Sequence, residues 1–549
     1  MTMRNQRTAT CLLVLALMPL AAKAEIKPAA LFTDNMVIQR DTKAPVWGWA
    51  EPGESVSVTG SWGGSATATA DPSGKWRVDL ETPPAGGPHT ITLEGKNKVV
   101  VENVLSGDVW LCSGQSNMEW PAAKALNPYE EAQNADHPRI RHFRVQKNAS
   151  QEPADNCTGQ WVVCAPDAVK DFSATAYFTG RELEKNLDVP IGLLVSSWGG
   201  TCVEAWTDGA EQTDDPLAAK RKAEVDAKAG KYSPETAATA HERKLKLWEE
   251  QVAAAKATNK RPPRQPLPPQ DPRASQKYPG SLYNGMIVPL LPYAIKGAVW
   301  YQGESNAQAP RVAGAKRDKA ATGSADAREM ARHYRVQLDR MVRNWRKAWG
   351  SEFPFFAVQL PDYGTPQKNP VENGEAWPLI RESVVHVAKN TPGVFTATML
   401  GLGEENNLHP VNKQGVGRRM ASTILNKTYG KDTPTTPFLA SSAIEGEKII
   451  LEFAFTGSGL EAKDAPLGGF AIAGEDKNFV RAEAEILADG GGKRVAVTAP
   501  GIKKPVAVRY AWADNPVGAN LQSKEGFPAS PFRTDDWDLG EVPAATAAQ

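Results

Sequence analysis

The sequence predicts a mixed α/β protein in which a parallel α/β unit is flanked by two β regions. Three observations support this prediction. Residues 27–105 alternate polar and apolar side chains between turn signals, residues 106–436 alternate apolar strands with helices, and from about residue 437 the alternating pattern returns. Strands that alternate with helices along a chain form parallel sheets whose two faces are both covered. A chain of 549 residues is also long enough for two or three domains.

Composition is that of a globular protein and narrows the classes of partner. Lys plus Arg and Asp plus Glu both number 63, so the formal charge is zero and the basic excess typical of nucleic-acid-binding proteins is missing. The 46 Gly and 42 Pro follow no collagen-like period, which excludes a fibrous protein. We therefore expect no nucleic-acid partner.

The first 24 residues are expected to be a secretory signal peptide. Two arginines precede an apolar run that ends at Ala22, and Ala22-Lys23-Ala24 matches a small-x-small cleavage site. This run is too short to span a membrane, and no other stretch of the sequence is apolar enough to do so. We therefore expect cleavage after Ala24 and export, to the periplasm or into the medium.

Four cysteines remain after that cleavage, namely Cys112, Cys157, Cys164 and Cys202. In an oxidising compartment Cys157 and Cys164, in the segment CTGQWVVC, could close a small disulfide loop; free thiols are the alternative, because sequence alone does not give the geometry. The spacing of the cysteines does not fit a zinc site, and no His lies near a Cys pair. We expect neither a metal nor a cofactor.

Residues 25–105 are expected to form an N-terminal β-sandwich. The segments VWGWAEPGESVSVTG, SATATADPSGKWRVDLE and HTITLEGKNKVVVENV alternate in polarity, and Glu-Pro-Gly and Asp-Pro-Ser-Gly mark tight turns between short strands. The same pattern returns at residues 437–549, in KIILEFAF, FVRAEAEILA, KRVAVTA and VAVRYAW. It predicts a C-terminal β-rich region, which is a candidate to pack on the first.

Residues 106–436 are expected to form the α/β unit. VWLCSGQSN predicts a buried strand that enters a turn, and VPIGLLVS, GAVWY and FPFFAVQL predict further strands. Residues 173–187 and a long amphipathic segment that ends at Gly350 predict helices. A charged, Ala-rich helical stretch and a Pro-rich tether, at about 209–275, hold few large apolar residues, so we expect a surface insertion there.

The segment SGQSNM places Ser116 directly after a predicted strand. A serine at a strand-to-helix turn points its hydroxyl out of the carboxyl edge of the sheet and leaves its own N–H able to face an oxyanion. The α/β-hydrolase elbow G-x-S-x-G is not matched, because Met118 stands where the second Gly should be. Ser116 is therefore a candidate nucleophile, with a simple helix cap as the structural alternative.

Two further loops follow predicted strands and offer hydrogen-bond donors. In SSWGGTCVEAW, Gly199 and Gly200 let the backbone approach a ligand closely and provide N–H groups. In WYQGESNA, the side-chain amides of Gln302 and Asn306 lie at the predicted sheet edge, where either could donate to a developing negative charge. A plain turn, and loop residues bonded to their own backbone, are the structural alternatives.

A serine nucleophile needs a base, and His409 is the best placed of the seven histidines. It lies between the strand-like VFTATML and a predicted helix, C-terminal to Ser116 in the chain, and Pro410 restricts its backbone. Ligands of open α/β sheets bind at the carboxyl ends of the strands. All four loops are predicted to meet at that edge.

The motifs SGQSNM, SSWGGT, WYQGESNA and LHPVNKQGVG, in that order, resemble the sialate O-acetylesterase family of the SGNH-hydrolase superfamily. The resemblance extends over nearly all of the chain after the signal peptide and includes LFTDNMVIQRD, LYNGMIVPL, VRYAWADNP and PFRTD. Related members include bacterial esterases that remove acetyl groups from plant polysaccharides such as xyloglucan. The resemblance implies a flavodoxin-like α/β/α catalytic domain and a serine nucleophile.

Carried over by position, the resemblance implies Ser116 as nucleophile and His409 as general base. It implies an oxyanion hole made by the N–H of Ser116, the N–H of a Gly in the second motif and a side-chain amide in the third. The Gly is Gly199 or Gly200, and the amide is Asn306 or Gln302.

One position departs from the family pattern, which has Asp three residues before the His. Here that residue is Asn406, which could accept the imidazole N–H but could not stabilise an imidazolium by charge. In a serine protease the same change costs about 10⁴ in rate. Glu404 or Glu405 could supply the carboxylate, the enzyme could work as a Ser–His pair with Asn406 as orienter, or activity could be reduced.

Together these features predict an exported carbohydrate O-acetylesterase that acts through an acetyl-enzyme. The expected substrate is an O-acetylated glycan, either O-acetyl sialic acid or an acetylated plant polysaccharide of the xyloglucan kind. The alternative is a glycan-binding protein whose esterase site has decayed, which two β regions and 16 Trp would suit.

Overall fold

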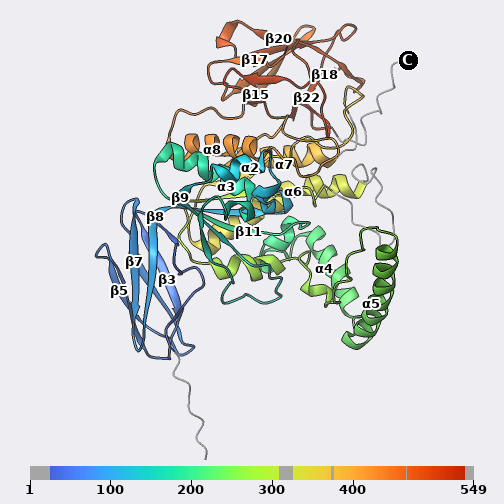
Figure 1. The fold of residues 1–549 in the computed structure, drawn as a ribbon. Coiled ribbons are helices and arrows are strands. Elements are labelled where there is room, and N and C mark those ends of the chain that lie inside the picture. The colour runs from blue at the N-terminus through green and yellow to red at the C-terminus, as the bar shows by residue number, and fades with distance from the viewer. Residues whose placement is uncertain (1–24, 308–324, 372–375, 465, 538–549) are drawn as a thin grey trace, which may run out of the picture.

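The computed structural model describes residues 25–307, 325–371, 376–464 and 466–537. The expected signal peptide lies outside these residues. Figure 1 shows a mixed α/β centre with the N-terminal strands (blue) and the C-terminal strands (red) at opposite ends of the molecule. Among the described residues, no helix combines the length and the apolar content that a membrane span requires.

A large mixed sheet forms the centre of the fold. Strands β9, β11, β8, β12, β13 and β14 run parallel in that order, and β10 adds an antiparallel edge next to β9. Every residue of β11, β12 and β13 is buried, which requires cover on both faces of the sheet. The bounds are β8 Lys98–Gly114, β9 His137–Arg144, β10 Trp161–Cys164, β11 Ile191–Ser197, β12 Gly297–Tyr301, β13 Phe355–Val358 and β14 Val394–Ala397.

Strand β8 joins this sheet to the N-terminal β region. Its 17 residues alternate in exposure up to Asn103 and are buried from Val104 to Gly114. The first half pairs with β7 and the second half with β11 and β12. The change marks the passage from an antiparallel sheet with one solvent face to a parallel sheet covered on both. The boundary expected between residues 105 and 106 therefore falls inside one continuous strand.

The N-terminal β region shares its core with the α/β centre. Phe32 lies edge-on to Trp47, with ring centroids 4.8 Å apart, and 5.7 Å from Tyr293 of the α/β centre. The Tyr293 hydroxyl donates to the backbone oxygen of Val37 at 2.6 Å. The strands are β1 Lys27–Pro28, β2 Val37–Gln39, β3 Lys43–Trp49, β4 Ser55–Gly60, β5 Ser65–Thr69, β6 Lys75–Glu81 and β7 Gly86–Glu94.

The helices of the α/β centre pack in two pairs, α3 with α8 and α6 with α7. The predicted helix at 173–187 is confirmed as α3, which begins after the cap Ser173, whose hydroxyl accepts from the N–H of Ala176. The long predicted helix is confirmed as α6, and it ends before Gly350, whose φ of +64° stops it. The bounds are α1 Ser116–Glu119, α2 Pro128–Gln133, α3 Ala174–Leu187, α6 Ala325–Trp349, α7 Ala376–Asn390 and α8 Lys413–Tyr429.

The expected insertion contains two helices, α4 (Pro216–Ala229) and α5 (Pro234–Ala257). None of the residues of α5 is buried, and Figure 1 shows this helix at the margin of the molecule. The Pro-rich segment 260–271 that follows has no regular structure. Helix α4 differs, because it buries Ala218 and Ala229 against the rest of the chain.

The C-terminal β region does not pack on the first one, and that expectation is wrong. Most of its buried residues form a second core, and it meets the α/β centre instead, where Trp512 joins the central core and Arg381 of α7 donates to the backbone oxygens of Ala513 and Asp514. Two four-stranded sheets and one strand pair make up the region. The strands are β15 Phe438–Glu445, β16 Lys448–Ala454, β17 Leu460–Ala462, β18 Phe470–Ala473, β19 Phe479–Arg481, β20 Glu483–Leu487, β21 Arg494–Thr498, β22 Ala507–Tyr510, β23 Leu521–Ser523 and β24 Phe532–Arg533.

The disulfide considered between Cys157 and Cys164 is not formed, and the free-thiol alternative holds. All four cysteines of the described residues are free. Cys164 is buried in β10 with its Sγ 3.4 Å from the backbone oxygen of Ala135, so its thiol is directed at a carbonyl.

Candidate active site

Ser116 lies where β8 leaves the sheet and α1 begins. The turn depends on Gly114, whose φ is +137° and where a Cβ would stand 2.1 Å from the backbone oxygen of Tyr301 on β12. The side chain of Ser116 is half-buried, and its backbone N–H donates to no acceptor among the described residues. Ser116 thus presents both its hydroxyl and its amide at the carboxyl edge of the sheet.

His409 is brought to Ser116 across 293 residues of chain. Its Nε2 lies 2.8 Å from Ser116 Oγ, within the distance over which a base takes a proton from a nucleophile. The loop between β14 and α8 holds His409 in place, since its N–H donates to Asn407 Oδ1 at 3.0 Å and Pro410 is buried.

The surroundings of His409 keep its imidazole neutral. Burial, together with the nearby cations Lys413 and Lys124, holds the pKa of His409 below its usual value. A neutral imidazole can accept the serine proton at neutral pH, which is the state that a general base needs.

None of the three candidate orienters reaches the imidazole. Asn406 and Glu405 are exposed, and the Glu404 carboxylate accepts from the N–H of Val411 at 2.8 Å and from Asn407 Nδ2 at 3.2 Å. In the described part of the chain, no side chain is hydrogen-bonded to His409 Nδ1. The structure therefore brings Ser116 and His409 together without a third acid.

The second motif lies against Ser116. A Cβ at Gly199 would stand 3.1 Å from Ser116 Cβ, so only glycine allows this approach without displacement. The N–H of Gly199 donates to Glu119 Oε2 at 2.8 Å, and Glu119 Oε1 pairs with Lys147 Nζ at 2.5 Å. Gly200 is exposed with a φ of +74°, and its N–H donates to no acceptor in the described ranges. Of these two amides, only that of Gly200 is free for a substrate.

The two amides of the third motif are engaged with their own surroundings. Asn306 is fully buried, its Nδ2 donates to Glu204 Oε2 at 3.0 Å, and its Oδ1 accepts from Val203 N–H at 3.1 Å. Gln302 Nε2 donates to Asn306 Oδ1 at 2.8 Å and approaches Gln115 Oε1 at 3.1 Å. Both amides lie close under the Ser116 turn, and neither is directed at Ser116 Oγ by a hydrogen bond.

A buried polar network beneath the site was missed in the sequence. Asn117 Nδ2 donates to Glu304 Oε1 at 2.5 Å and to the backbone oxygen of Leu408 at 3.1 Å, and Asn117 Oδ1 accepts from Lys413. Burial raises the pKa of Glu304 to about 7 and lowers the pKa of Lys413 to about 7. The network ties the residue after Ser116 to the residue before His409. The sequence feature that could have indicated this network is a charged residue inside each of two motifs, Glu304 in QGES and Lys413 in HPVNK.

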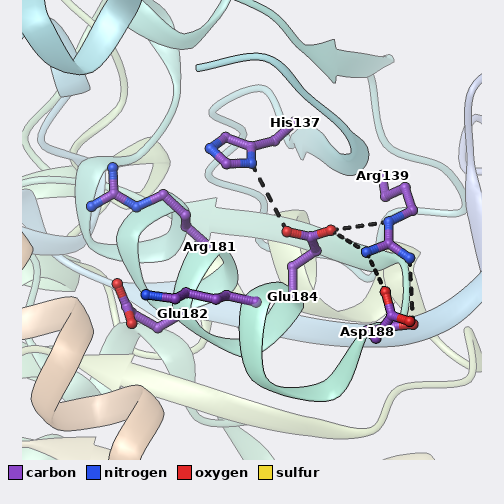
Figure 2. A pocket seen from close by; sticks show the side chains of 7 residues that line it. His137, Arg139, Arg181, Glu182, Glu184 and Asp188 are labelled. Carbon is purple, nitrogen blue, oxygen red and sulfur yellow. Dashed lines mark hydrogen bonds and ion pairs between the residues drawn. The ribbon is translucent and has the colours of Figure 1, made fainter. Parts of the chain in front are cut away.

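A charged surface hollow of about 400 Å³ lies elsewhere, at the C-terminal part of α3 and the start of β9 (Figure 2). Arg139 pairs there with Glu184 at 2.5 Å and with Asp188 at 2.8 Å. Arg181, on its wall, pairs with Glu131. The hollow is lined by an ion-pair network in which both arginines, Arg139 and Arg181, already have carboxylate partners. Within the described ranges, no group of three or more His, Cys, Asp or Glu is arranged to hold a metal ion.

Comparisons with known proteins identify the class of enzyme to which the chain is similar. A family model described as "Carbohydrate esterase, sialic acid-specific acetylesterase" matches residues 106–231. Sialate O-acetylesterase from Mus musculus is 28% identical over 477 residues, which is 77% of each chain, and the Homo sapiens protein is 27% identical over 74% of this chain and 72% of its own. The crystal structure of a carbohydrate acetylesterase from Xanthomonas citri is similar with a TM-score of 0.75 and 32% identity, over 93% of this chain and all of that one.

The chain belongs to the sialate O-acetylesterase family. It is a carbohydrate esterase with a mixed α/β fold and additional β regions. The residues that the family model matches include Ser116, Gly199 and Gly200, whereas His409 lies outside them. The matched range therefore covers the Ser116 turn and the second motif but not the loop that carries His409.

Proposed function

We propose that this esterase removes acetyl groups from sugars by nucleophilic catalysis, with Ser116 as nucleophile and His409 as general base, and without a metal or cofactor. One observation carries the proposal, the distance of 2.8 Å between Ser116 Oγ and His409 Nε2. It is found at the carboxyl edge of an α/β sheet, the place where such sheets bind ligands.

In this mechanism Ser116 Oγ attacks the acetyl carbonyl carbon while His409 Nε2 takes the serine proton. The tetrahedral intermediate collapses to an acetyl-enzyme as the sugar oxygen leaves with the proton from His409. Water then attacks the acetyl carbonyl with His409 again as base, and acetate leaves as Ser116 regains its proton. The unengaged N–H groups of Ser116 and Gly200 are the proposed oxyanion donors, each contributing roughly 3 kcal/mol.

A third oxyanion donor would come from Gln302 or Asn306, as the family resemblance implies. Gln302 Nε2 already has three acceptors and must first give up a hydrogen bond, whereas Asn306 Nδ2 donates to Glu204 and has a second N–H. Gly199 is in the same position as Gln302, because Glu119 would have to release its N–H.

We place the catalytic unit in the SGNH superfamily with a flavodoxin-like topology. Strand order supports this: if β8, β11, β12, β13 and β14 are numbered along the chain, their spatial order is 2-1-3-4-5. Strands β9 and β10 are then additions at one edge.

We also propose that the chain is organised in three units, at residues 25–105, 106–436 and 437–549. The Ala22-Lys23-Ala24 site is the basis for proposing export. N-terminal sequencing of the mature protein tests it, with Glu25 expected as the first residue.

The substrate is proposed to be an O-acetylated glycan, either sialic acid or a plant polysaccharide. Acetate release from an O-acetylated sialoglycan and from acetylated xyloglucan, measured side by side, decides between them. Ser116→Ala is the negative control. It is expected to lower turnover by about 10³-fold or more at an unchanged melting temperature.

Turnover that survives in a clean Ser116→Ala preparation would refute the nucleophile. If the wild-type protein releases acetate from neither glycan yet binds one of them, the alternative of a glycan-binding protein with a decayed site is favoured. Preference for the sialoglycan makes the chain a sialate esterase, and preference for xyloglucan makes it a cell-wall esterase.

A further inference from the structure

His409 lies flat against the indole of Trp120. The two ring centroids are 4.6 Å apart and the ring planes differ by 16°. The indole is itself held, since Nε1 donates to the backbone oxygen of Lys124 at 3.0 Å and the Trp120 carbonyl accepts from the N–H of Ala174 at 2.8 Å. Trp120 directly follows α1, so the segment that begins with Ser116 also holds the ring that faces its base.

The stack provides two things that a general base requires. An imidazole without a hydrogen bond at Nδ1 can rotate about its Cβ–Cγ bond, and a flat indole on one face opposes that rotation and keeps Nε2 toward Ser116 Oγ. When His409 takes the serine proton it becomes an imidazolium, and a cation over an indole face is attracted by the ring quadrupole. In a Ser-His-Asp triad, a carboxylate supplies both effects.

We propose that Trp120 is the positioning residue of His409, and that its indole does here what the carboxylate does in a triad. The inference rests on the proposed Ser116–His409 chemistry and extends it. Trp120 acts through the imidazole and does not touch the acetyl group, so it is not a catalytic residue.

The charged groups around the imidazole support this role. Lys413, from α8, and Lys124, from the turn after Trp120, both disfavour the imidazolium. Glu404 lies in the same loop as His409, and its two carboxylate oxygens accept hydrogen bonds from Asn407 and Val411 of that loop. Among the groups named here, the indole is the one in ring-to-ring contact with the imidazole, and its face favours the charged form.

A substrate without a sugar separates positioning from sugar binding. With p-nitrophenyl acetate, Trp120→Leu is expected to lower kcat about 30-fold at nearly unchanged KM, the equivalent of one desolvated cation–π contact. Trp120→Phe keeps an aromatic face and is expected to recover most of that rate. The rate at which a fluorophosphonate labels Ser116 should fall and recover in parallel, because labelling needs the same proton transfer.

Trp62→Leu is the matched control. Trp62 Nε1 also donates to a backbone oxygen, that of Glu81 at 2.8 Å, and its ring lies against His89 at 5.2 Å, but in the N-terminal β region. This variant is expected to keep wild-type kcat. If Trp120→Leu melts well below the control, Trp120→Met is measured in the same assays, because its unbranched, flexible side chain adapts better to the space of the indole and has no aromatic face.

Wild-type kcat in Trp120→Leu or Trp120→Met at an unchanged melting temperature would overturn the proposal, and so would a Trp120→Phe variant as slow as Trp120→Leu. Ser116→Ala is measured beside them. Turnover that survives Ser116→Ala refutes the Ser–His chemistry itself, whereas an inactive Ser116→Ala with a fast Trp120→Leu refutes only the role of Trp120.

Discussion

Asn406 occupies the position at which the family pattern has a catalytic aspartate, and its side chain is exposed. The loop carries His409 to Ser116 by other means, through the bond from its N–H to Asn407 and through the Glu404 carboxylate that closes the loop on Val411. Residue 406 therefore does not orient the imidazole, whatever its side chain. An amide and a carboxylate at this exposed position should have equally small effects on His409.

Asn406→Asp is accordingly expected to change kcat/KM on an acetate ester by less than about threefold, because an exposed carboxylate that does not reach Nδ1 is screened by solvent. The measurement is steady-state hydrolysis at neutral pH. Glu405→Gln, which removes a charge from the neighbouring exposed position, is the matched control. A gain of tenfold or more in Asn406→Asp alone would mean that residue 406 reaches the imidazole during turnover.

Elements with a local sequence signal were predicted, and features that depend on distant contacts were not. The helix of residues 173–187 and the strand GAVWY have their caps and apolar runs in adjacent residues, and both are confirmed. The continuity of β8 was missed because it depends on a change of pairing partners, which sequence does not show.

The same division applies to the site. The sequence singles out Ser116 and His409 because each stands in a motif after a strand, and the structure brings the two side chains together. The environment of His409 was not found, because the indole of Trp120 stacks on a residue from a distant loop. The network of Asn117, Glu304 and Lys413 joins three segments for the same reason.

Helix α4 of the insertion is anchored beneath the third motif. Arg221 pairs with Glu204 at 2.9 Å, and the other oxygen of Glu204 accepts from Asn306 Nδ2. The Glu204 side chain is 2% exposed, so its charge depends on these partners. Arg221→Met should leave that carboxylate without its cation, with a loss of stability of about 3 kcal/mol and a fall in kcat as Asn306 and Gln302 shift.

Lys222→Met, the next position on the same helix, is the control for that experiment. Lys222 pairs with Asp226 at 2.7 Å on an exposed face, where such pairs add little to stability. Urea unfolding and kcat are measured for both variants. Equal, small effects of Arg221→Met and Lys222→Met would mean that the insertion is not coupled to the site.

At the scale of the whole molecule, the two β regions differ in how they are attached. The N-terminal region is fused to the α/β centre by β8 and by one common core that includes Phe32, Val37 and Tyr293. Most buried residues of the C-terminal region form a second core that includes Leu400 of the centre, while Trp512 joins the central core. Polar contacts such as Gln359 Nε2 to Ser530 Oγ at 3.0 Å add to this junction. Figure 1 shows the two regions at opposite ends, so neither supports the other.

Deletion of the two regions should therefore have unequal consequences. A chain of residues 106–549 lacks the first half of β8 and the N-terminal part of the shared core, and it is expected not to fold. A chain of residues 25–436 loses most of a second core, and Arg381 and Gln359 lose the bonds that they make to Ala513, Asp514 and Ser530. It is expected to fold with a melting temperature lower by several degrees and to keep Ser116-dependent ester hydrolysis. Circular dichroism and thermal melts of both chains test this, and the reverse order of stability would show that the C-terminal region, not the shared core, holds the catalytic unit together.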